Sequence, residues 1–350
     1  MLVNCRSTLS SVIIRQTETF LNQQENAVDF PNSMHITVLS ILLLGMLSGP
    51  IQAQDDQAPK QLLASAASIK WVNEPSPKDL PFPEGVQHLS FRSNLVEKEI
   101  GYCIYLPKAY RTNAIQRFPV IYNLHGNGGN EFTGLPAAAL LHQQIESGHL
   151  PPLMMVMFNG GKSTFYKNSA DGQFPIESIF ITEFVPYIDA TYRTIAEGAG
   201  RCIEGFSMGG RGSTRLAIKY PSLFCSLFCQ AGNVPRLIEF FDSTPAEQRH
   251  LLLLGEDRKN WVADDVYANC EKNLDQIKQH LRIQIACGTQ DDGHLPTVRD
   301  LHSHLTNLGI DHTYIELEGL AHQRPLMMKQ LGPIWFDYHV ESLRRSGALD

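Results

Sequence analysis

Gly205-Phe206-Ser207-Met208-Gly209-Gly210 decides the fold of this 350-residue chain, because a serine with a glycine two residues away on each side has the form of a nucleophile elbow. Residues 199–206 are typical of a short buried strand, and residues 208–220 carry apolar side chains at a helical spacing. The serine lies on the sharp turn between them. Because a side chain at either flanking glycine would clash, the pattern predicts a strained turn that lifts the Ser207 hydroxyl clear of the sheet.

Short apolar runs alternate with helical patterns on both sides of this turn. Besides residues 199–206, we expect strands at residues 86–92, 96–106, 118–124, 153–158, 226–231, 282–287 and 312–317. Besides residues 208–220, we expect helices at residues 136–146, 176–192, 295–308 and 325–344. The alternation predicts one α/β domain over residues 85–345, with a mainly parallel, doubly wound sheet and helices on both faces.

The amino-terminal part of the chain is typical of an export signal. Residues 36–51 are apolar and almost uncharged, and the polar, acidic residues 54–56 follow Ala53. This apolar run is shorter than the roughly 20 residues that cross a bilayer, so we expect cleavage after Ala53 and no stable membrane span afterwards. The protein would then be secreted or periplasmic. An uncleaved anchor is the alternative, because Ile51 rather than a small residue stands three positions before the cleavage point.

Residues 1–53 are therefore interpreted as a leader, with Met34 as an alternative start of translation. Residues 54–84 hold five prolines and scattered charges, which is typical of an extension or strap lying on the domain. The leader holds two of the 29 basic and three of the 36 acidic residues, so the mature chain has a net charge of −6. That charge, with no basic stripe in the sequence, argues against nucleic acid as a partner.

The cysteines give no sign of a redox motif or a zinc site, because the sequence contains no C-x-x-C pair. The mature chain has six, and an even number in an exported protein permits disulfides. However, four of them lie in expected strands, where cysteine usually serves as a small core residue. We therefore favour free buried thiols. The four are Cys103, Cys202, Cys229 and Cys287.

A serine hydroxyl needs a base to take its proton and a carboxylate to orient that base. In open parallel sheets, such groups gather at the carboxyl ends of the strands. The strand at residues 282–287 is followed by Asp291, and the strand at residues 312–317 is followed by His322. This gives the chain order Ser, Asp, His expected for a catalytic triad on this kind of sheet. We choose Asp291 over its neighbour Asp292 because it closes the preceding turn.

Acyl transfer also needs donors for the oxyanion that forms at the substrate carbonyl. One donor is expected to be the backbone amide of Met208, at the start of the helix after the nucleophile. The second is expected from the glycine-rich loop 125–130, where we choose the amide of Asn127. Glu204 lies on the strand before the nucleophile, where a carboxylate would be buried. It therefore needs a buried partner, such as Arg211.

We expect no cofactor and no metal. The group Asp291, Asp292 and His294, and the pair His302 and His304, contain residue types that bind metals. Neither set is accompanied by further ligands or by groups that would orient them. The substrate pocket is expected to take its shape from residues 159–175 and 233–269, which the sequence leaves without assigned elements.

Four blocks resemble the putative-esterase family of α/β-hydrolases, which includes feruloyl esterases, enterochelin esterases and S-formylglutathione hydrolases. The resemblance covers roughly residues 86–338, and feruloyl esterase-like members are the most similar. It implies an α/β-hydrolase fold and serine esterase activity. After His322, the chain has Gln323-Arg324-Pro325 where the family often has an aromatic residue. The blocks are residues 124–129, Glu183-Phe184-Val185-Pro186-Tyr187-Ile188-Asp189, the elbow block 205–210, and Cys287-Gly288-Thr289-Gln290-Asp291.

The expected function is that of an exported serine esterase working through an acyl-enzyme. The substrate would be a small-molecule or polysaccharide ester, with a feruloyl or acetyl group linked to carbohydrate. Two alternatives stay open. An acyltransferase would use the same triad and pass the acyl group to a sugar, and a non-catalytic carbohydrate-binding protein would keep the hydrolase scaffold without activity. The sequence does not decide the oligomeric state.

Overall fold

The computed structural model describes residues 69–242 and 253–350 of the chain. The leader, the signal segment and the cleavage site predicted within residues 1–53 lie outside the described residues, as do residues 54–68 of the extension. In the described part of the chain, no helix is long and apolar enough to cross a membrane.

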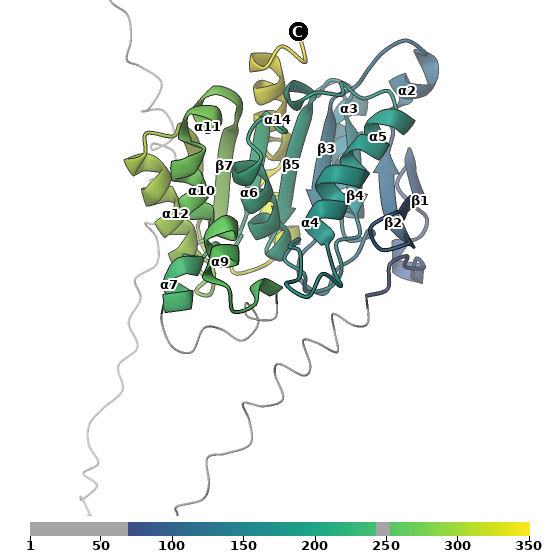
Figure 1. Ribbon diagram of the computed structural model, residues 1–350. Helices are drawn as coiled ribbons and strands as arrows, with labels where there is room; N and C mark the ends of the chain where they lie inside the picture. The colour runs from purple at the N-terminus through teal and green to yellow at the C-terminus, as the bar shows by residue number, and fades with distance from the viewer. Residues whose placement is uncertain (1–68, 243–252) are drawn as a thin grey trace, which may run out of the picture. The chain divides into compact units, whose positions relative to one another are not determined.

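An eight-stranded sheet forms the centre of the domain, in the order β1-β2-β4-β3-β5-β6-β7-β8 (Figure 1). β2 pairs with β1 and β4 in antiparallel fashion, and all the other neighbours are parallel. The mainly parallel sheet is confirmed, and every expected strand is present with ends shifted by no more than two residues. The strands are β1 (Val86–Ser93), β2 (Lys98–Tyr105), β3 (Val120–Leu124), β4 (Met154–Phe158), β5 (Arg201–Phe206), β6 (Ser226–Gln230), β7 (Arg282–Gly288) and β8 (His312–Leu317).

Helices cover both faces of this sheet. In Figure 1, α5 and α6 lie in front of the strands, and α3 and α14 lie behind them. The described α-helices are α2 (Lys108–Thr112), α3 (Leu135–Glu146), α4 (Ile176–Ser178), α5 (Val185–Thr191), α6 (Met208–Lys219), α7 (Leu237–Asp242), α9 (Arg258–Asp264), α10 (Val266–Lys272), α11 (Leu274–His280), α12 (Leu295–Asn307), α13 (Arg324–Leu331) and α14 (Ile334–Arg345).

The central strands are buried on both faces, which explains their continuous apolar sequences. Every residue of β3, β4, β5 and β6 is buried. α6 is buried from Met208 to Ile218, so the helix that follows Ser207 lies in the interior. β1 is at the edge, and its side chains are more exposed than those of the central strands. The nucleophile turn is therefore built between a fully buried strand, β5, and a helix, α6, that is buried over most of its length.

Two regions differ from the sequence prediction. The single terminal helix expected at residues 325–344 is wrong: α13 ends before Gly332, which has φ 51°, and α14 begins after Pro333. A positive φ interrupts helical geometry, and proline removes the next backbone donor. The helix expected at residues 176–192 is present, but its middle is a π-helical segment, Ile179–Phe184, between α4 and α5.

Residues 69–84, called the strap below, are bound to the catalytic end of the sheet by two buried side chains. The Glu131 carboxylate accepts hydrogen bonds from the backbone and side-chain amides of Asn73, both at 2.8 Å. The Asn159 amide donates to the carbonyl oxygens of Lys70 and Trp71 at 2.9 and 2.8 Å. Since Glu131 and Asn159 each belong to loops that follow strands β3 and β4, the strap holds these loops in place.

The six cysteines of the described residues are all buried and unpaired, as predicted.

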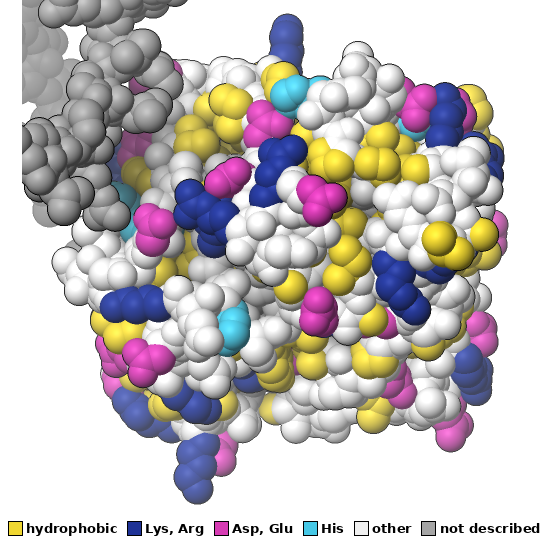
Figure 2. Space-filling view, turned by 90° about the horizontal axis from the view of Figure 1, so that it is seen from above, with side chains coloured by type: hydrophobic (Ala, Val, Ile, Leu, Met, Phe, Trp, Pro, Cys, Tyr) yellow, Lys and Arg dark blue, Asp and Glu magenta, His cyan; other side chains and the backbone are white. Residues whose placement is uncertain are grey.

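Figure 2 shows the end of the domain where the parallel strands begin, opposite the end that carries Ser207. Lys and Arg side chains are interspersed there with Asp and Glu side chains. The visible part of this face therefore carries no extended patch of one charge.

Candidate active site

The nucleophile turn is strained and closely packed. Ser207 has φ 59° and ψ −119°, an uncommon conformation for a residue with a side chain. A Cβ on Gly209 would lie 2.0 Å from the carbonyl oxygen of Leu124, and a Cβ on Gly205 would lie 2.4 Å from the carbonyl carbon of Gly209. Since these obstacles are backbone atoms, they cannot rotate away. Both glycines are therefore required by the approach of β3 and α6.

The structure brings together the three residues that the sequence predicts as a triad. The Ser207 hydroxyl oxygen lies 2.9 Å from His322 Nε2, and His322 Nδ1 lies 2.6 Å from Asp291 Oδ2. A carboxylate oxygen accepts hydrogen bonds, so His322 carries its proton on Nδ1 and donates it to Asp291 Oδ2. Nε2 is then the acceptor of the Ser207 hydroxyl. This arrangement can draw a proton from the serine and hold the imidazolium that results.

The two loops that carry Asp291 and His322 are joined by backbone hydrogen bonds. Thr289 N donates to Leu317 O at 2.9 Å, and Gln290 N donates to Leu320 O at 3.0 Å. β7 and β8 are parallel neighbours, so their carboxyl ends lie side by side and these bonds extend the pairing into the loops. Beneath the carboxylate, Cys287 Sγ donates to Asp291 Oδ2 at 3.8 Å, and burial raises the pKa of this thiol to about 12.

A second histidine, which the sequence prediction did not assign to the triad, contacts both Asp291 and His322. His294 Nδ1 lies 2.8 Å from Asp291 Oδ1, so the carboxylate binds one histidine with each oxygen. The rings of His294 and His322 are stacked, with centroids 3.9 Å apart and planes within 7°. Burial, and then the neighbouring His322, lower the pKa of His294. The hydrogen bond and the stacking of His294 limit the freedom of the Asp291–His322 pair.

The sequence contained one signal for this residue. His294 stands three positions after Asp291, at the start of α12, which is a spacing at which side chains of one turn meet. In the described residues, Asp291, His294 and His322 are the one group of three side chains close enough to share a metal ion. However, both ring Nδ1 atoms face oxygens of the same carboxylate, which is the geometry of hydrogen bonding. We assign no metal to this group.

The two residues whose amides are predicted as oxyanion donors belong to the cavity beside Ser207. Asn127 and Met208 both line this cavity, together with Ser207 and His322. Among the described residues, neither backbone amide donates to a protein acceptor. The next two amides of the loop are already used, since Gly128 N donates to Lys162 O and Gly129 N donates to Gly126 O. These bonds give loop 125–130 its shape and leave the Asn127 amide available to a ligand oxygen.

His125, at the start of this loop, is buried and neutral. Its Nε2 accepts a hydrogen bond from Gly160 N at 3.1 Å, so Nδ1 carries the proton and donates to Gly126 O at 2.9 Å. Burial lowers the pKa of His125 to about 4. A protonated ring would lose the bond from Gly160, since both nitrogens would then be donors.

This histidine predicts a loss of stability in acid. Its pKa is lower in the folded protein than in the unfolded chain, so the unfolded chain binds more protons between pH 6.5 and 4. The free energy of unfolding should therefore fall by about 3 kcal/mol over this range through His125 alone. Urea denaturation at a series of pH values, compared with His125→Gln, measures the contribution. Equal pH slopes in the two proteins would contradict it.

The partner suggested for Glu204 is wrong. This fully buried carboxylate does not pair with Arg211 but accepts from the side-chain amides of Asn123 and Gln230 on the two neighbouring strands. His339 Nε2 of α14 lies 3.4 Å from Glu204 Oε2, the oxygen that also accepts from Gln230. β3 and β6 flank β5, so a side chain on either strand reaches Glu204 directly. The carboxylate thus holds together the strands on both sides of the nucleophile strand.

Arg324 belongs to the stretch Gln323-Arg324-Pro325, which stands after His322 where the family often has an aromatic residue. Its guanidinium is buried and donates to Thr133 O at 2.8 Å and to Asn123 Oδ1 at 3.3 Å. These bonds tie the loop that carries His322 to the loop before α3. Arg324 therefore acts as a brace behind the site and does not line the cavity.

The cavity beside Ser207 has a volume of about 430 Å³ and two walls that belong to the segments expected from the sequence. Residues 159–175 contribute Phe165, and residues 233–269 contribute Asn233, Pro235 and Phe240. The lining combines polar side chains with the aromatic rings of Phe165 and Phe240. The lining residues are Asn127, Phe165, Ser207, Met208, Arg211, Asn233, Pro235, Phe240, His294 and His322.

Comparison with known proteins shows the family to which the chain belongs. The model of the family described as "Putative esterase" matches residues 93–325. The chain belongs to this esterase family. This match confirms the resemblance to the putative-esterase family that the sequence blocks indicated. The esterase is 32% identical to an esterase of Mycobacterium tuberculosis over 151 residues, which cover 41% of the chain and 31% of the relative. It is 31% identical to an endo-1,4-beta-xylanase/feruloyl esterase of Xylanibacter ruminicola over 149 residues, 40% of the chain and 20% of the relative. The esterase thus spans a third or less of the length of these relatives.

Solved structures share the fold of the esterase. A ferulic acid esterase superposes with a TM-score of 0.61 at 20% identity, covering 74% of the chain and 99% of the neighbour. An S-formylglutathione hydrolase from Agrobacterium tumefaciens superposes with a TM-score of 0.58 at 19% identity, covering 74% and 95%. These neighbours confirm the α/β-hydrolase fold.

Proposed function

We propose that this esterase is an exported serine hydrolase that cleaves carbohydrate-linked acyl groups of the feruloyl or acetyl type through an acyl-enzyme. The observation that carries the proposal is the continuous chain from Ser207 Oγ through His322 to the buried Asp291 carboxylate, with distances of 2.9 and 2.6 Å. This chain supplies a nucleophile, a base and an orienting anion in one cavity.

In the first half of the reaction, Ser207 Oγ attacks the ester carbonyl while His322 Nε2 accepts the hydroxyl proton. The amides of Asn127 and Met208 donate to the oxyanion that forms, and Asp291 stabilises the imidazolium. The intermediate collapses, the C–O bond to the alcohol breaks, and His322 gives its proton to the leaving oxygen. In the second half, His322 takes a proton from the water that attacks the acyl-enzyme; the C–Oγ bond then breaks, His322 returns the proton to Ser207 Oγ, and the acid is released.

The substrate class rests on three supports. The endo-1,4-beta-xylanase/feruloyl esterase of Xylanibacter ruminicola is a relative, and a ferulic acid esterase is a structural neighbour. Phe165, Pro235 and Phe240 give the cavity a wall that suits a flat acyl group. An export signal would bring the enzyme to extracellular polysaccharide, and the mass of the secreted protein tests it: the chain should begin at Gln54.

Hydrolysis of acetyl, feruloyl and longer acyl esters by the purified protein tests the function. We expect turnover of at least one carbohydrate-linked ester and none by Ser207→Ala. Transfer of the acyl group to an added sugar in preference to water would instead indicate an acyltransferase. Failure to hydrolyse any ester, together with failure of Ser207 to react with an activated phosphonate, would favour a carbohydrate-binding protein.

The choice between the two neighbouring aspartates gives a separate prediction. Asp291→Asn should lower kcat by about 10⁴-fold, because an amide donates to His322 and favours the wrong tautomer. Asp292→Asn should stay near the wild-type rate, because Asp292 is exposed and has no contact with His322. Steady-state kinetics on one activated ester compares the two. The reverse order of effects would reassign the carboxylate.

A further inference from the structure

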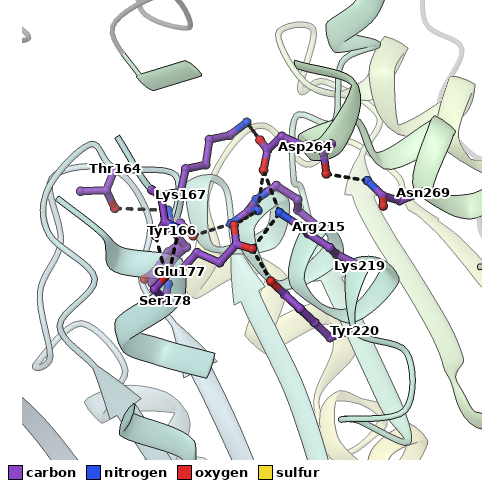
Figure 3. Close-up of polar contacts among 12 residues, drawn as sticks. Thr164, Tyr166, Lys167, Glu177, Ser178, Arg215, Lys219, Tyr220, Asp264 and Asn269 are labelled. Carbon is purple, nitrogen blue, oxygen red and sulfur yellow. Dashed lines mark hydrogen bonds and ion pairs between the residues drawn. The ribbon is translucent and has the colours of Figure 1, made fainter. Parts of the chain in front are cut away.

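A cluster of buried ionisable side chains joins residues of the loop after β4 to α4, α6 and α9 (Figure 3). Arg215 of α6 donates to Glu177 of α4 and, at 2.6 Å, to Asp264 of α9. Lys167 donates to the other oxygen of Asp264. Lys219 lies 2.8 Å from Glu177 and completes the group. The side chains of Lys167, Arg215, Glu177 and Asp264 are at most 6% exposed, so four charges are held away from water.

Such a cluster is an unusual way to stabilise a fold. Removing charges from water carries a penalty that their mutual attraction offsets only in part, and well-packed apolar residues often serve as well. Burial lowers the pKa of Lys167 to about 7 in spite of the neighbouring Asp264. Unlike apolar contacts, hydrogen bonds between charged groups are directional, so each bond fixes the position of its partner. The question is which parts of the site the cluster fixes.

On one side, the cluster holds the loop that carries Phe165. The carbonyl of Tyr166 accepts from Arg215, and the next residue is Lys167. Phe165 and Tyr166 both have positive φ, 51° and 57°, a strained conformation that persists only where the surroundings enforce it. The Tyr166 hydroxyl also donates to His125 O at 3.0 Å. These restraints place the Phe165 ring in the wall of the cavity.

On the other side, the cluster holds the helices that carry Phe240. Asp264 is the last residue of α9, which packs with α7 through a separate apolar cluster that contains Leu237 and Trp261. Phe165 and Phe240 both pack against this cluster, and both line the cavity. The bond between Lys167 and Asp264 therefore joins the segment that carries Phe165 to the helix that packs against α7, which carries Phe240.

We propose that the buried Lys167–Asp264–Arg215 cluster sets the spacing between Phe165 and Phe240 and so selects the size of the acyl group that enters beside Ser207. This inference rests on the proposed function, because it assigns a selective role to the same cavity. The three charged residues act as positioning residues, since the cavity lining does not include them.

Lys167→Met tests the proposal, because methionine keeps much of the length of lysine and removes its charge. The measurement is kcat and KM for a series of p-nitrophenyl esters from acetyl to decanoyl and for one aromatic acyl ester. We expect the ratio of kcat/KM between the largest and the acetyl esters to change by about tenfold, mainly through KM, since pocket fit is worth that much. Lys259→Met, an exposed lysine of the same helix as Asp264, should leave the ratio unchanged.

A purely structural role predicts a different result. Lys167→Met would then lower the free energy of unfolding and leave the ratio as in the wild type, which would overturn the proposal. If Lys167→Met does not fold, Lys167→Met/Asp264→Asn removes both charges, and Phe165→Leu and Phe240→Leu alter the walls directly. An unchanged ratio in both leucine variants would overturn the proposal as well. A wild-type protein that hydrolyses no ester would remove the proposed function instead.

Discussion

Ser207→Ala and His322→Ala should each lower kcat by about 10⁶-fold, and the double variant should lower it no further. The reason is that the two side chains act as one unit. Without its base, the Ser207 hydroxyl keeps its proton, and without the hydroxyl, the base has no proton to accept. The 2.9 Å contact between Oγ and Nε2 makes each residue dependent on the other.

Single-turnover and steady-state kinetics on an activated ester measure these losses. A residual rate above that of water is expected in all three variants, because the Asn127 and Met208 amides stay in place. His302→Ala serves as the control, since His302 stacks on Tyr314 at the surface and does not line the cavity. Additive losses in the double variant would show that Ser207 and His322 do not act together.

Gly209→Ala should abolish the native fold around the nucleophile. The added Cβ would stand 2.0 Å from Leu124 O and 2.8 Å from His125 O, so β3 and α6 would have to separate. Displacing two buried elements costs on the order of 4–5 kcal/mol or more, a large part of the 5–15 kcal/mol that typically stabilises a domain. We expect either insoluble protein or a soluble protein that is strongly destabilised and inactive.

Gly293→Ala is the matched control, because its Cβ would meet no atom within 4 Å although Gly293 lies beside His294 in the same catalytic end of the sheet. Urea denaturation and circular dichroism compare the two variants. Wild-type stability of Gly209→Ala would mean that the approach of α6 to β3 is looser than the structure has it.

The sequence predicted the elements and the meeting of Ser207, Asp291 and His322 for one reason. Parallel strands end at the same edge of the sheet, so residues that follow β5, β7 and β8 must lie near one another whatever the loops do. The ends of these strands could be located in the sequence because buried strands are continuous apolar runs. Predicting this part of the site requires only the hydrophobic periodicity of the sequence and the order of the strands along the chain.

The sequence did not predict what depends on the detailed shape of the loops. The stacking of His294 on His322 follows from how α12 begins, and the partner of Glu204 follows from the register of the strands beside it. Arg211 stands only seven residues from Glu204, but it faces the cavity and its guanidinium lies over the Phe165 ring. The walls of the cavity come from two segments whose fold is fixed by long-range contacts, which periodicity does not report.

The thiol beneath Asp291 gives the site a chemical reporter. Cys287 is fully buried, and its raised pKa keeps it as the unreactive thiol at neutral pH. An alkylating reagent can reach it only when β7 and its loop separate from their neighbours. The rate at which Cys287 is labelled therefore counts how often the carboxylate end of the site opens, in the same way that amide exchange counts the opening of a backbone bond.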